Sequence, residues 1–250
     1  ALHSNLPWVY FTKMPGMKIR NFFTKILMEI SIRYCDNLIV DSNFAKKEIV
    51  EILKINEEKV HVIYLGIEEN YLEYKNNDYY IKNFKYQDYI ISVLSCVKYH
   101  NIKNLLEAFK LLKKENNSQI KFVFVMQILD KDYFFEIKNF VKNNFKEDEI
   151  IFFHDLNDKY LVNLYRNAIC YIFSSYCEVF GLTSLEAMSQ GCPVIISKKS
   201  ALPEINGLAA EYFDPDNIEQ IKESMNKVLS NKNYRLDLIN RGKTHCKKFN

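Results

Sequence analysis

Three features of the sequence predict an α/β fold of the doubly wound class in two units. Apolar runs of strand length recur along the chain, and they are continuous rather than alternating, as in parallel strands buried on both faces. Segments with helical periodicity lie between these runs. A polar, tyrosine-rich stretch breaks the alternation between Gly66 and Tyr89, which indicates a linker between two α/β units.

The elements follow from these patterns in chain order. The first unit has two expected strands and begins abruptly, so we expect its front half to be missing. The second unit, from about residue 88 to the end, has five. The expected strands are "NLIVDS" (37–42), "VHVIYL" (60–65), "YIISVLS" (89–95), "IKFVFVM" (120–126), "EIIFFH" (149–154), "AICYIFSS" (168–175) and "CPVIIS" (192–197). The expected helices are "AKKEIVEIL" (45–53), "IKNLLEAFKLLKKE" (102–115), "YFFEIKNFVKNNF" (133–145), "KYLVNLYRNA" (159–168), "SLEAMSQ" (184–190) and "NIEQIKESMNKVLSN" (217–231).

Composition narrows the function classes. The 250 residues carry 34 basic and 31 acidic side chains, a net charge of +3 that is too balanced to indicate a nucleic-acid partner. The six cysteines form no C-x-x-C pair or zinc spacing, which favours reduced core thiols in a cytoplasmic protein without a metal. The segment from Lys13 to Lys25 is mildly basic and has Trp8 and two phenylalanines nearby. It is typical of a solvated helix face, but it could also contact the inner face of the cell membrane peripherally.

The stretch "EVFGLTSLEAMSQGCPVI" (178–195) concentrates two carboxylates, two glycines and a proline in a glycine-poor chain. The preceding strand ends near Ser175, and a helix is expected to start near Thr183. Gly181 allows a close backbone approach to a ligand. The N–H groups of residues 182–184 would then form a helix N-terminus that can receive a phosphate.

The two glutamates have both a functional and a local interpretation. Glu178, at the carboxyl end of a strand, could meet sugar hydroxyls, or it could be an exposed loop carboxylate. Glu186 could accept two hydrogen bonds from a ribose diol. Alternatively, Thr183-x-x-Glu186 is a capping box that needs no ligand, and Gly191 is a helix stop. Neither the dinucleotide fingerprint G-x-G-x-x-G nor the phosphate loop G-x-x-x-x-G-K-[ST] is present in the sequence.

The wider string "SSYCEVFGLTSLEAMSQGCPVIISKKSALPEINGLAAEYFDPDNIEQI" resembles the retaining family 4 glycosyltransferases, which have the GT-B architecture. That family has Glu, seven residues and Glu, then "EAM…G.PV" and "PE…G.A…F.P.D". The segments at 36–69 and 91–112 also look like the end of its acceptor domain and the start of its sugar-donor domain. The matching residues are Glu178, Glu186, Ala187, Met188, Gly191, Pro193, Val194, Pro203, Glu204, Gly207 and 214–216.

This resemblance implies two Rossmann-like doubly wound domains, the N-terminal one incomplete. The acceptor-binding part would cover residues 1–66, the linker 67–87 and the sugar-donor domain 88–250. A nucleoside-diphosphate sugar would bind between the domains, and its sugar would be transferred with retention, without a metal or other cofactor. Glu178 would contact the donor sugar and Glu186 the ribose. The backbone of Phe180, Gly181 and Leu182, together with Thr183, would line the sugar and the phosphates.

The sequence departs from the family where "G-R-x-x-x-x-K-G" normally supplies two cations to the diphosphate. Alignment on "LLEAF" puts Leu94, Ser95, His100 and Asn101 at the four fixed positions of that motif. His100 could substitute as a protonated imidazole. The cations of Lys98 and Lys103 could also reach the diphosphate, or all three side chains could be ordinary loop residues.

Two residues fall on the expected acceptor side. The stretch "LHSNLP" places His3 where relatives have a histidine near the donor sugar, and Gly66 precedes the linker. The resemblance therefore implies a glycosyltransferase acting on a glycan or lipid-linked acceptor in surface polysaccharide or lipopolysaccharide synthesis, with GDP-mannose as the suggested donor. The alternatives are a non-catalytic nucleotide-sugar-binding subunit and a sugar-nucleotide epimerase of the same architecture.

Overall fold

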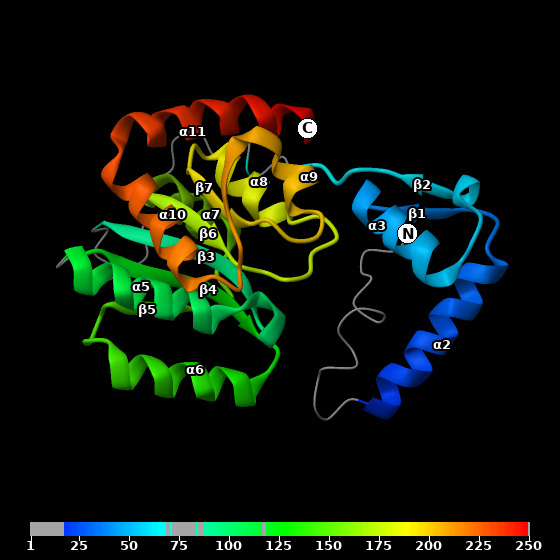
Figure 1. Cartoon of the computed structure of the whole chain (residues 1–250), viewed down its shortest axis with the longest axis horizontal. Coiled ribbons are helices and arrows are strands. Elements are labelled where there is room, and N and C mark those ends of the chain that lie inside the picture. The colour runs from blue at the N-terminus through cyan, green and yellow to red at the C-terminus, as the bar shows by residue number, and fades with distance from the viewer. Residues whose placement is uncertain (1–17, 69–70, 72–83, 85–87, 117–118, 250) are drawn as a thin grey trace. The chain divides into compact units, whose positions relative to one another are not determined.

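The computed structural model describes residues 18–68, 71, 84, 88–116 and 119–249 of the chain (Figure 1). The chain divides into two compact units, and the two loops around residues 179 and 202 belong to the smaller one. The expected boundaries at residues 66 and 88 flank a segment that is largely outside the described residues, so they remain a prediction. The smaller unit comprises Ala1–Leu65, Cys177–Gly181 and Lys199–Ile205, and the larger one Gly66–Tyr176, Leu182–Lys198 and Asn206–Asn250.

The smaller unit has a two-stranded parallel sheet with Leu38 opposite Val60. Its core is apolar because the inward residues of the strands pack against one face of each helix. Ser42 caps the second helix by accepting the N–H of Ala45, and the helix ends at Lys54, which adopts the left-handed conformation. The elements are α2 (Lys18–Tyr34), β1 (Leu38–Val40), α3 (Asn43–Leu53), the 3-10 helix η1 (Glu57–Lys59) and β2 (Val60–Val62).

The larger unit has a six-stranded sheet in which all strands are parallel, in the order β5-β4-β3-β6-β7-β8. The sequence predicted five of these strands and missed β8. That strand escaped because Glu211 and Tyr212 interrupt its apolar pattern, and both are only half-buried. The strands are β3 (Tyr89–Cys96), β4 (Lys121–Ile128), β5 (Ile150–Phe153), β6 (Cys170–Phe173), β7 (Val194–Ser197) and β8 (Ala210–Phe213).

Helices cover both faces of this sheet (Figure 1). One layer contains α5 in contact with α6 and α10, and the other contains α8 in contact with α7 and α11. Burial of the strands between these layers explains their continuous apolar runs. The helices of this unit are η2 (Lys98–His100), α5 (Ile102–Asn116), α6 (Lys131–Asn144), α7 (Asp158–Asn167), α8 (Leu182–Ser189), η3 (Gly207–Ala209), α10 (Ile218–Ser230), α11 (Lys232–His245) and η4 (Cys246–Phe249). The short helix α9 (Leu202–Asn206) belongs to the smaller unit except for its last residue.

The strand order reverses between β3 and β6, because the chain first winds outward through β4 and β5 and then returns. This is the topological switch point at which open parallel sheets bind ligands, outside the carboxyl ends of the strands. β3 pairs with β6 through Ile90 and Ile91, near its amino end. The fold therefore directs attention to the loops that follow β3 and β6. The predicted α/β fold with a doubly wound parallel sheet is confirmed.

The helix stop predicted at Gly191 is also confirmed. Gly191 has φ +75 and donates its N–H to the carbonyl of Met188, while Cys192 donates to Ala187. These two bonds form a Schellman motif, which places a residue without a Cβ where the backbone turns left-handed. The motif ends α8 sharply and directs the chain into β7.

Candidate active site

Four of the predicted site residues lie between the end of β3 and the start of α5. Ser95 is half-buried near the carboxyl end of β3, and Lys98 and Lys103 are exposed on either side of His100. His100 itself is only 7% exposed. Its ring lies 4.5 Å from that of Tyr99 and 5.2 Å from that of Phe173, and its Nδ1 lies 2.6 Å from the carbonyl oxygen of Ser95. Among the four, the two lysines are therefore the cations that face solvent.

Hydrogen bonds join the loop after β3 to the loop after β6. The Ser174 hydroxyl donates to the carbonyls of His100 (2.8 Å) and Asn101 (3.2 Å), and the Tyr176 N–H donates to the Tyr99 carbonyl (2.9 Å). Asn101 adopts φ +56, and its side-chain amide donates to the carbonyl of Pro215 in the loop after β8. Three strand ends of the larger unit are thus tied together at the switch point.

The N-terminus of α8 does not contain the capping box that the sequence allowed. The helix begins at Leu182, directly after Gly181, so Thr183 lies within the first turn and is not the residue before it. Its hydroxyl instead lies 2.7 Å from the hydroxyl of Tyr171 on β6. Gly181 has φ +93, a conformation that L residues with a side chain rarely adopt. The chain therefore enters α8 through a left-handed glycine, and the helix begins without a threonine cap.

Glu186, on the second turn of α8, is a nearly buried carboxylate that keeps 9% of its surface exposed. The hydroxyl of Tyr165 on α7 donates to its Oε2 at 3.3 Å. Burial raises the pKa of Glu186 to about 7; the Tyr165 hydrogen bond opposes this rise, and the negative charges of Asp158 and Glu68 add to it. A carboxyl in this environment changes its charge near neutral pH, which surface carboxyls do not do.

The segment after β2 also contributes to the surroundings of Glu186. Tyr71 is buried, and its hydroxyl lies 3.5 Å from a carboxylate oxygen of Asp158. Gln190, just beyond α8, donates from its side-chain amide to the Tyr71 carbonyl and accepts from Nε of Arg166 at 2.8 Å. Burial raises the pKa of the Tyr71 hydroxyl, and the Glu186 charge adds to this rise, so the phenol stays protonated. Glu186 therefore lies near protonated phenols and near the negative charges of Asp158 and Glu68.

Glu178, Phe180 and Gly181 belong to the smaller unit. The backbone of Glu178 is fixed at both ends, because its N–H donates to the Ser200 hydroxyl (2.8 Å) and its carbonyl accepts from the N–H of Ala201 (3.2 Å). Phe180 is 2% exposed. These bonds hold the loop rigidly, so the Glu178 side chain extends from an anchored backbone.

The sequence did not assign a role to Glu204, which the structure places at the N-terminus of α3. Its carboxylate accepts from the backbone N–H groups of Asn43 and Phe44 (2.8 Å each) and from the Tyr64 hydroxyl (2.8 Å). An anion at a helix N-terminus is stabilised by the N–H groups of the first turn and by the helix dipole. Glu204 thus fastens the loop at 199–205, which in turn holds the backbone of Glu178. Its donors lie 140 to 161 positions earlier in the chain, so no local pattern could reveal them.

The remaining predicted residues lie elsewhere. Gly66 is exposed and lies near the carbonyl of Phe249 in the larger unit. His3 lies outside the described residues. Within the larger unit, Ser95 lies at the end of β3, Lys98 and His100 in η2, and Lys103 at the start of α5. Leu182, Thr183 and Glu186 lie on α8. No group of three or more His, Cys, Asp or Glu in the described part of the chain is arranged to hold a metal ion.

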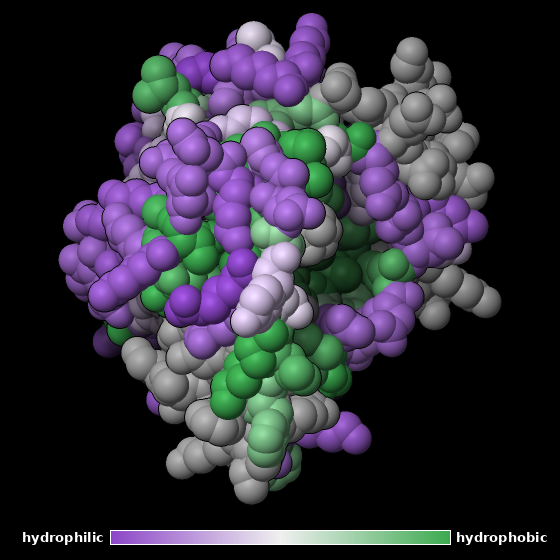
Figure 2. All heavy atoms as spheres, turned by 90° about the vertical axis from the view of Figure 1, so that its right-hand side faces the viewer, coloured by the Kyte–Doolittle hydropathy of each residue, from purple (hydrophilic) through white to green (hydrophobic). Residues whose placement is uncertain are grey.

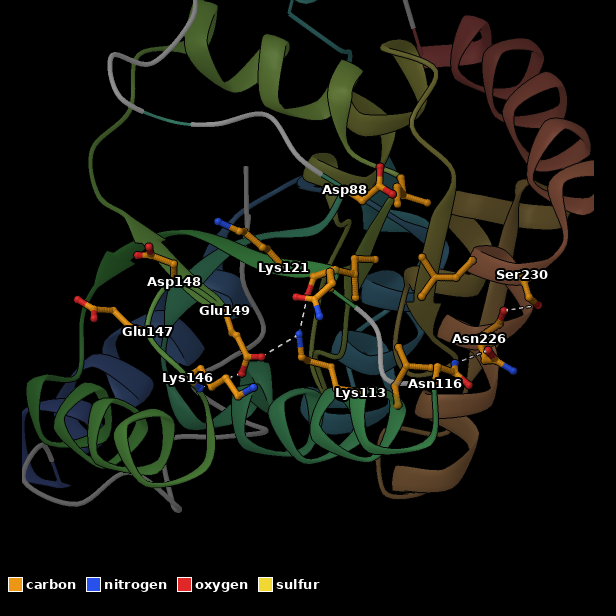
Figure 3. A pocket seen from close by; sticks show the side chains of 15 residues that line it. Asp88, Lys113, Asn116, Lys121, Lys146, Glu147, Asp148, Glu149, Asn226 and Ser230 are labelled. Atoms are coloured by element: carbon orange, nitrogen blue, oxygen red, sulfur yellow. Dashed lines mark hydrogen bonds and ion pairs between the residues drawn. The ribbon is translucent and has the colours of Figure 1, made fainter.

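A cavity of about 750 Å³ lies at the amino ends of the strands of the large sheet, opposite the ends that carry the switch-point loops (Figure 3). It is lined by residues that precede strands, such as Asp88 before β3 and Glu149 before β5. Glu149 forms an ion pair at 3.0 Å with Lys113, which also lines the cavity. Because ligands of doubly wound sheets bind at the carboxyl ends of strands, this cavity is not the candidate site.

The α2 helix presents an apolar face to solvent, visible as the hydrophobic patch low in Figure 2. Phe23 and Leu27 are 60% and 64% exposed, and Ile26 and Ile30 complete a stripe at helical spacing. No helix that the structure describes has the length and the apolar content needed to span a bilayer.

Comparison with known proteins identifies the family. Residues 80–245 match the family described as Glycosyl transferases group 1. The chain is 23% identical over 237 residues to the O-antigen chain mannosyltransferase RfbU of Salmonella typhimurium, covering 91% of this chain and 62% of that protein. It is 25% identical to O-antigen chain mannosyltransferase B of Escherichia coli, covering 85% of this chain and 56% of the relative. The chain thus spans about three fifths of the length of these relatives.

Solved structures of the GT-B class share the fold. Sucrose-phosphate synthase from Thermosynechococcus elongatus superimposes with a TM-score of 0.79 at 19% identity, over 98% of this chain and 62% of that one. An E. coli trehalose-6-phosphate structure, bound with UDP-2-fluoro glucose, gives a TM-score of 0.78 at 10% identity, over 96% and 61%. The predicted GT-B fold is confirmed, and with well over half of its length matched by the family, the chain belongs to the glycosyl transferases group 1.

Proposed function

We propose that the chain carries the sugar-nucleotide site of a retaining, metal-independent family 4 glycosyltransferase. Its substrate would be a nucleoside-diphosphate sugar, with GDP-mannose the first choice because two relatives are O-antigen mannosyltransferases. The acceptor would be a glycan or a lipid-linked glycan of a surface polysaccharide. The observation that carries this proposal is the nearly buried Glu186 carboxylate on α8, the helix that follows the switch-point strand β6.

Each residue has a chemical task in this proposal. The Glu186 carboxylate accepts the ribose hydroxyls, and the N-terminus of α8 at Leu182 and Thr183 directs its dipole at the diphosphate. Lys98 and Lys103 supply positive charge near the end of β3, where the leaving diphosphate gains negative charge. Glu178 contacts the sugar from its anchored loop, and Phe180 and Gly181 line the sugar.

One observation favours a non-catalytic nucleotide-sugar-binding subunit as the second candidate. The two usual cations are replaced by Ser95 and by His100, and His100 is buried against Phe173. Loss of one charged donor to a developing oxyanion lowers a rate by about a hundredfold. The chain would then bind the sugar nucleotide without releasing the diphosphate.

The membrane contact suggested by the segment Lys13 to Lys25 stays a prediction. Part of that segment lies outside the described residues, and the rest begins α2. The sequence of α2 contains Lys18, Arg20, Lys25 and Arg33 against the single acid Glu29. Basic residues combined with an exposed apolar stripe are typical of helices that lie on anionic membranes.

Release of nucleoside diphosphate separates the two candidates. We expect the chain, incubated with GDP-mannose and a chelator but no acceptor, to transfer the mannosyl group to water and release GDP faster than the spontaneous hydrolysis. The Glu178→Gln variant should release it more slowly by about tenfold or more. The Glu115→Gln variant, altered at the exposed carboxyl end of α5, should match the unmodified chain. Binding of GDP-mannose without any release of GDP would contradict the enzyme and support the binding subunit.

A further inference from the structure

We propose that Tyr165 is a positioning residue for nucleoside binding: its hydroxyl occupies Oε2 of Glu186 and leaves Oε1 to accept the ribose hydroxyls. This inference rests on the proposed function, because it assumes that Glu186 meets a ribose. It assigns to α7, which the sequence signature does not include, the task of holding the signature carboxylate of α8.

The geometry fixes Tyr165 firmly. Its side chain is fully buried, and its ring meets the ring of Tyr171 at 5.9 Å in an edge-on arrangement. Its hydroxyl lies 3.3 Å from Oε2 of Glu186. Among the residues that the structure describes, no second side chain donates a hydrogen bond to this carboxylate. A buried aromatic ring has few alternative rotamers, so the hydroxyl holds the carboxylate in one orientation.

The surroundings of Glu186 explain why such a donor matters. Asp158, on the same helix as Tyr165, and Glu68, on the segment after β2, add negative charge that disfavours the carboxylate form. Tyr71, also on that segment, contributes a phenol that stays protonated. Tyr165 is the one group among these whose hydrogen bond favours the charged form. Its own hydroxyl remains a donor, because burial and the Glu186 charge raise the pKa of Tyr165 well above 10.

The ribose hydroxyls need the carboxylate form. An ionised carboxylate accepts at both oxygens, whereas a protonated one carries a donor on one of them. Nucleoside binding should therefore strengthen as pH rises toward neutrality and level off above it. Removal of the Tyr165 hydroxyl should move this rise to higher pH, since the charged form loses its one hydrogen bond.

The test compares Tyr165→Phe with the matched control Tyr89→Phe. Tyr89, on β3, is similarly buried. Its hydroxyl donates at 2.7 Å to the carbonyl of Leu164, the residue before Tyr165 on α7, and not to Glu186. Binding of GDP, UDP and ADP is titrated between pH 5.5 and 8.5. We expect Tyr165→Phe to bind the preferred nucleotide about three- to tenfold more weakly at pH 7, with recovery at pH 8.5. Tyr89→Phe should keep the pH midpoint of the unmodified chain.

A second readout does not need a ligand. The free energy of unfolding of each chain is measured against pH and referred to the same chain carrying Glu186→Gln, which isolates the titration of Glu186. An upward shift of this titration in Tyr165→Phe alone supports the link between the two residues. Equal titrations in the two tyrosine variants, or weaker binding that does not recover at high pH, would overturn it. If no nucleotide binds to the unmodified chain, the proposed function fails and the ligand role of Tyr165 with it, whatever the titration of Glu186 shows.

Discussion

Glu186→Gln is expected to stabilise the chain above neutral pH, the opposite of what loss of a helix cap would do. Folding raises the pKa of this carboxyl from 4.5 to about 7. The folded chain therefore holds a proton that the unfolded chain has released between these pH values, and the stability falls as pH rises through this window. Glutamine mimics the protonated acid at every pH. We expect the variant to be more stable than the unmodified chain by up to about 3 kcal/mol at pH 8, and nearly equal to it at pH 4.5.

Thermal or urea unfolding between pH 4.5 and 8 measures this difference, and Glu149→Gln serves as a control of opposite sign. Burial of Glu149 raises its pKa, but the Lys146 N–H and the Lys113 ammonium outweigh burial, so the net pKa is lowered. Glu149→Gln should therefore destabilise the chain at neutral pH, by an amount that shrinks as pH falls below 4.5. A loss of about 1 kcal/mol in Glu186→Gln that does not depend on pH would instead identify a simple cap.

Ser95→Arg is expected to increase the release of nucleoside diphosphate from the sugar donor by about a hundredfold. Ser95 is half-buried near the end of β3, at the switch point, where the resemblance places the missing arginine. A guanidinium there is always charged and can pair with two diphosphate oxygens as the negative charge develops. The measurement is the rate of GDP release from GDP-mannose under saturating donor.

The control for this variant is Ser95→Gln, which adds a long polar side chain without a charge. If the arginine and glutamine variants release GDP equally fast, the gain does not come from charge, and the assignment of this loop to the diphosphate is wrong. If only the arginine variant is faster, the slow step of the natural chain is departure of the diphosphate, whose developing negative charge is not fully compensated.

The fold could be predicted well because strands buried on both faces appear in the sequence as continuous apolar runs. All seven apolar runs predicted as strands are strands in the structure. The prediction missed β8 because Glu211 and Tyr212, in the middle of that strand, are half-buried and interrupt its apolar pattern. The helix stop at Gly191 was also readable from the sequence, since a glycine followed closely by a proline at the end of a helical pattern is typical of a helix terminus.

The site could be predicted less well because its contacts join distant residues. Thr183 and Glu186 have the spacing of a capping box, but Thr183 meets Tyr171 and Glu186 meets Tyr165, so tertiary contacts replace the local ones.

The burial of His100 and the role of Glu204 were hidden for the same reason. The His100 ring is covered by Phe173, which lies on a neighbouring strand. Glu204 accepts from donors at the start of α3, in a part of the chain far earlier in the sequence. Sequence spacing indicates which residues matter, but not which partners hold them.

Calorimetric titration of the chain and its Glu186→Gln variant with GDP-mannose at pH 8 decides whether Glu186 holds a nucleoside. We expect one saturable site on the unmodified chain and binding weaker by about 1.5–3 kcal/mol in the variant, the scale of a hydrogen bond to a charged group. UDP- and ADP-sugars, titrated in the same way, reveal whether another base is preferred. Equal affinity in both chains, or no binding of any of these sugar nucleotides, would contradict the assignment of Glu186 to the ribose.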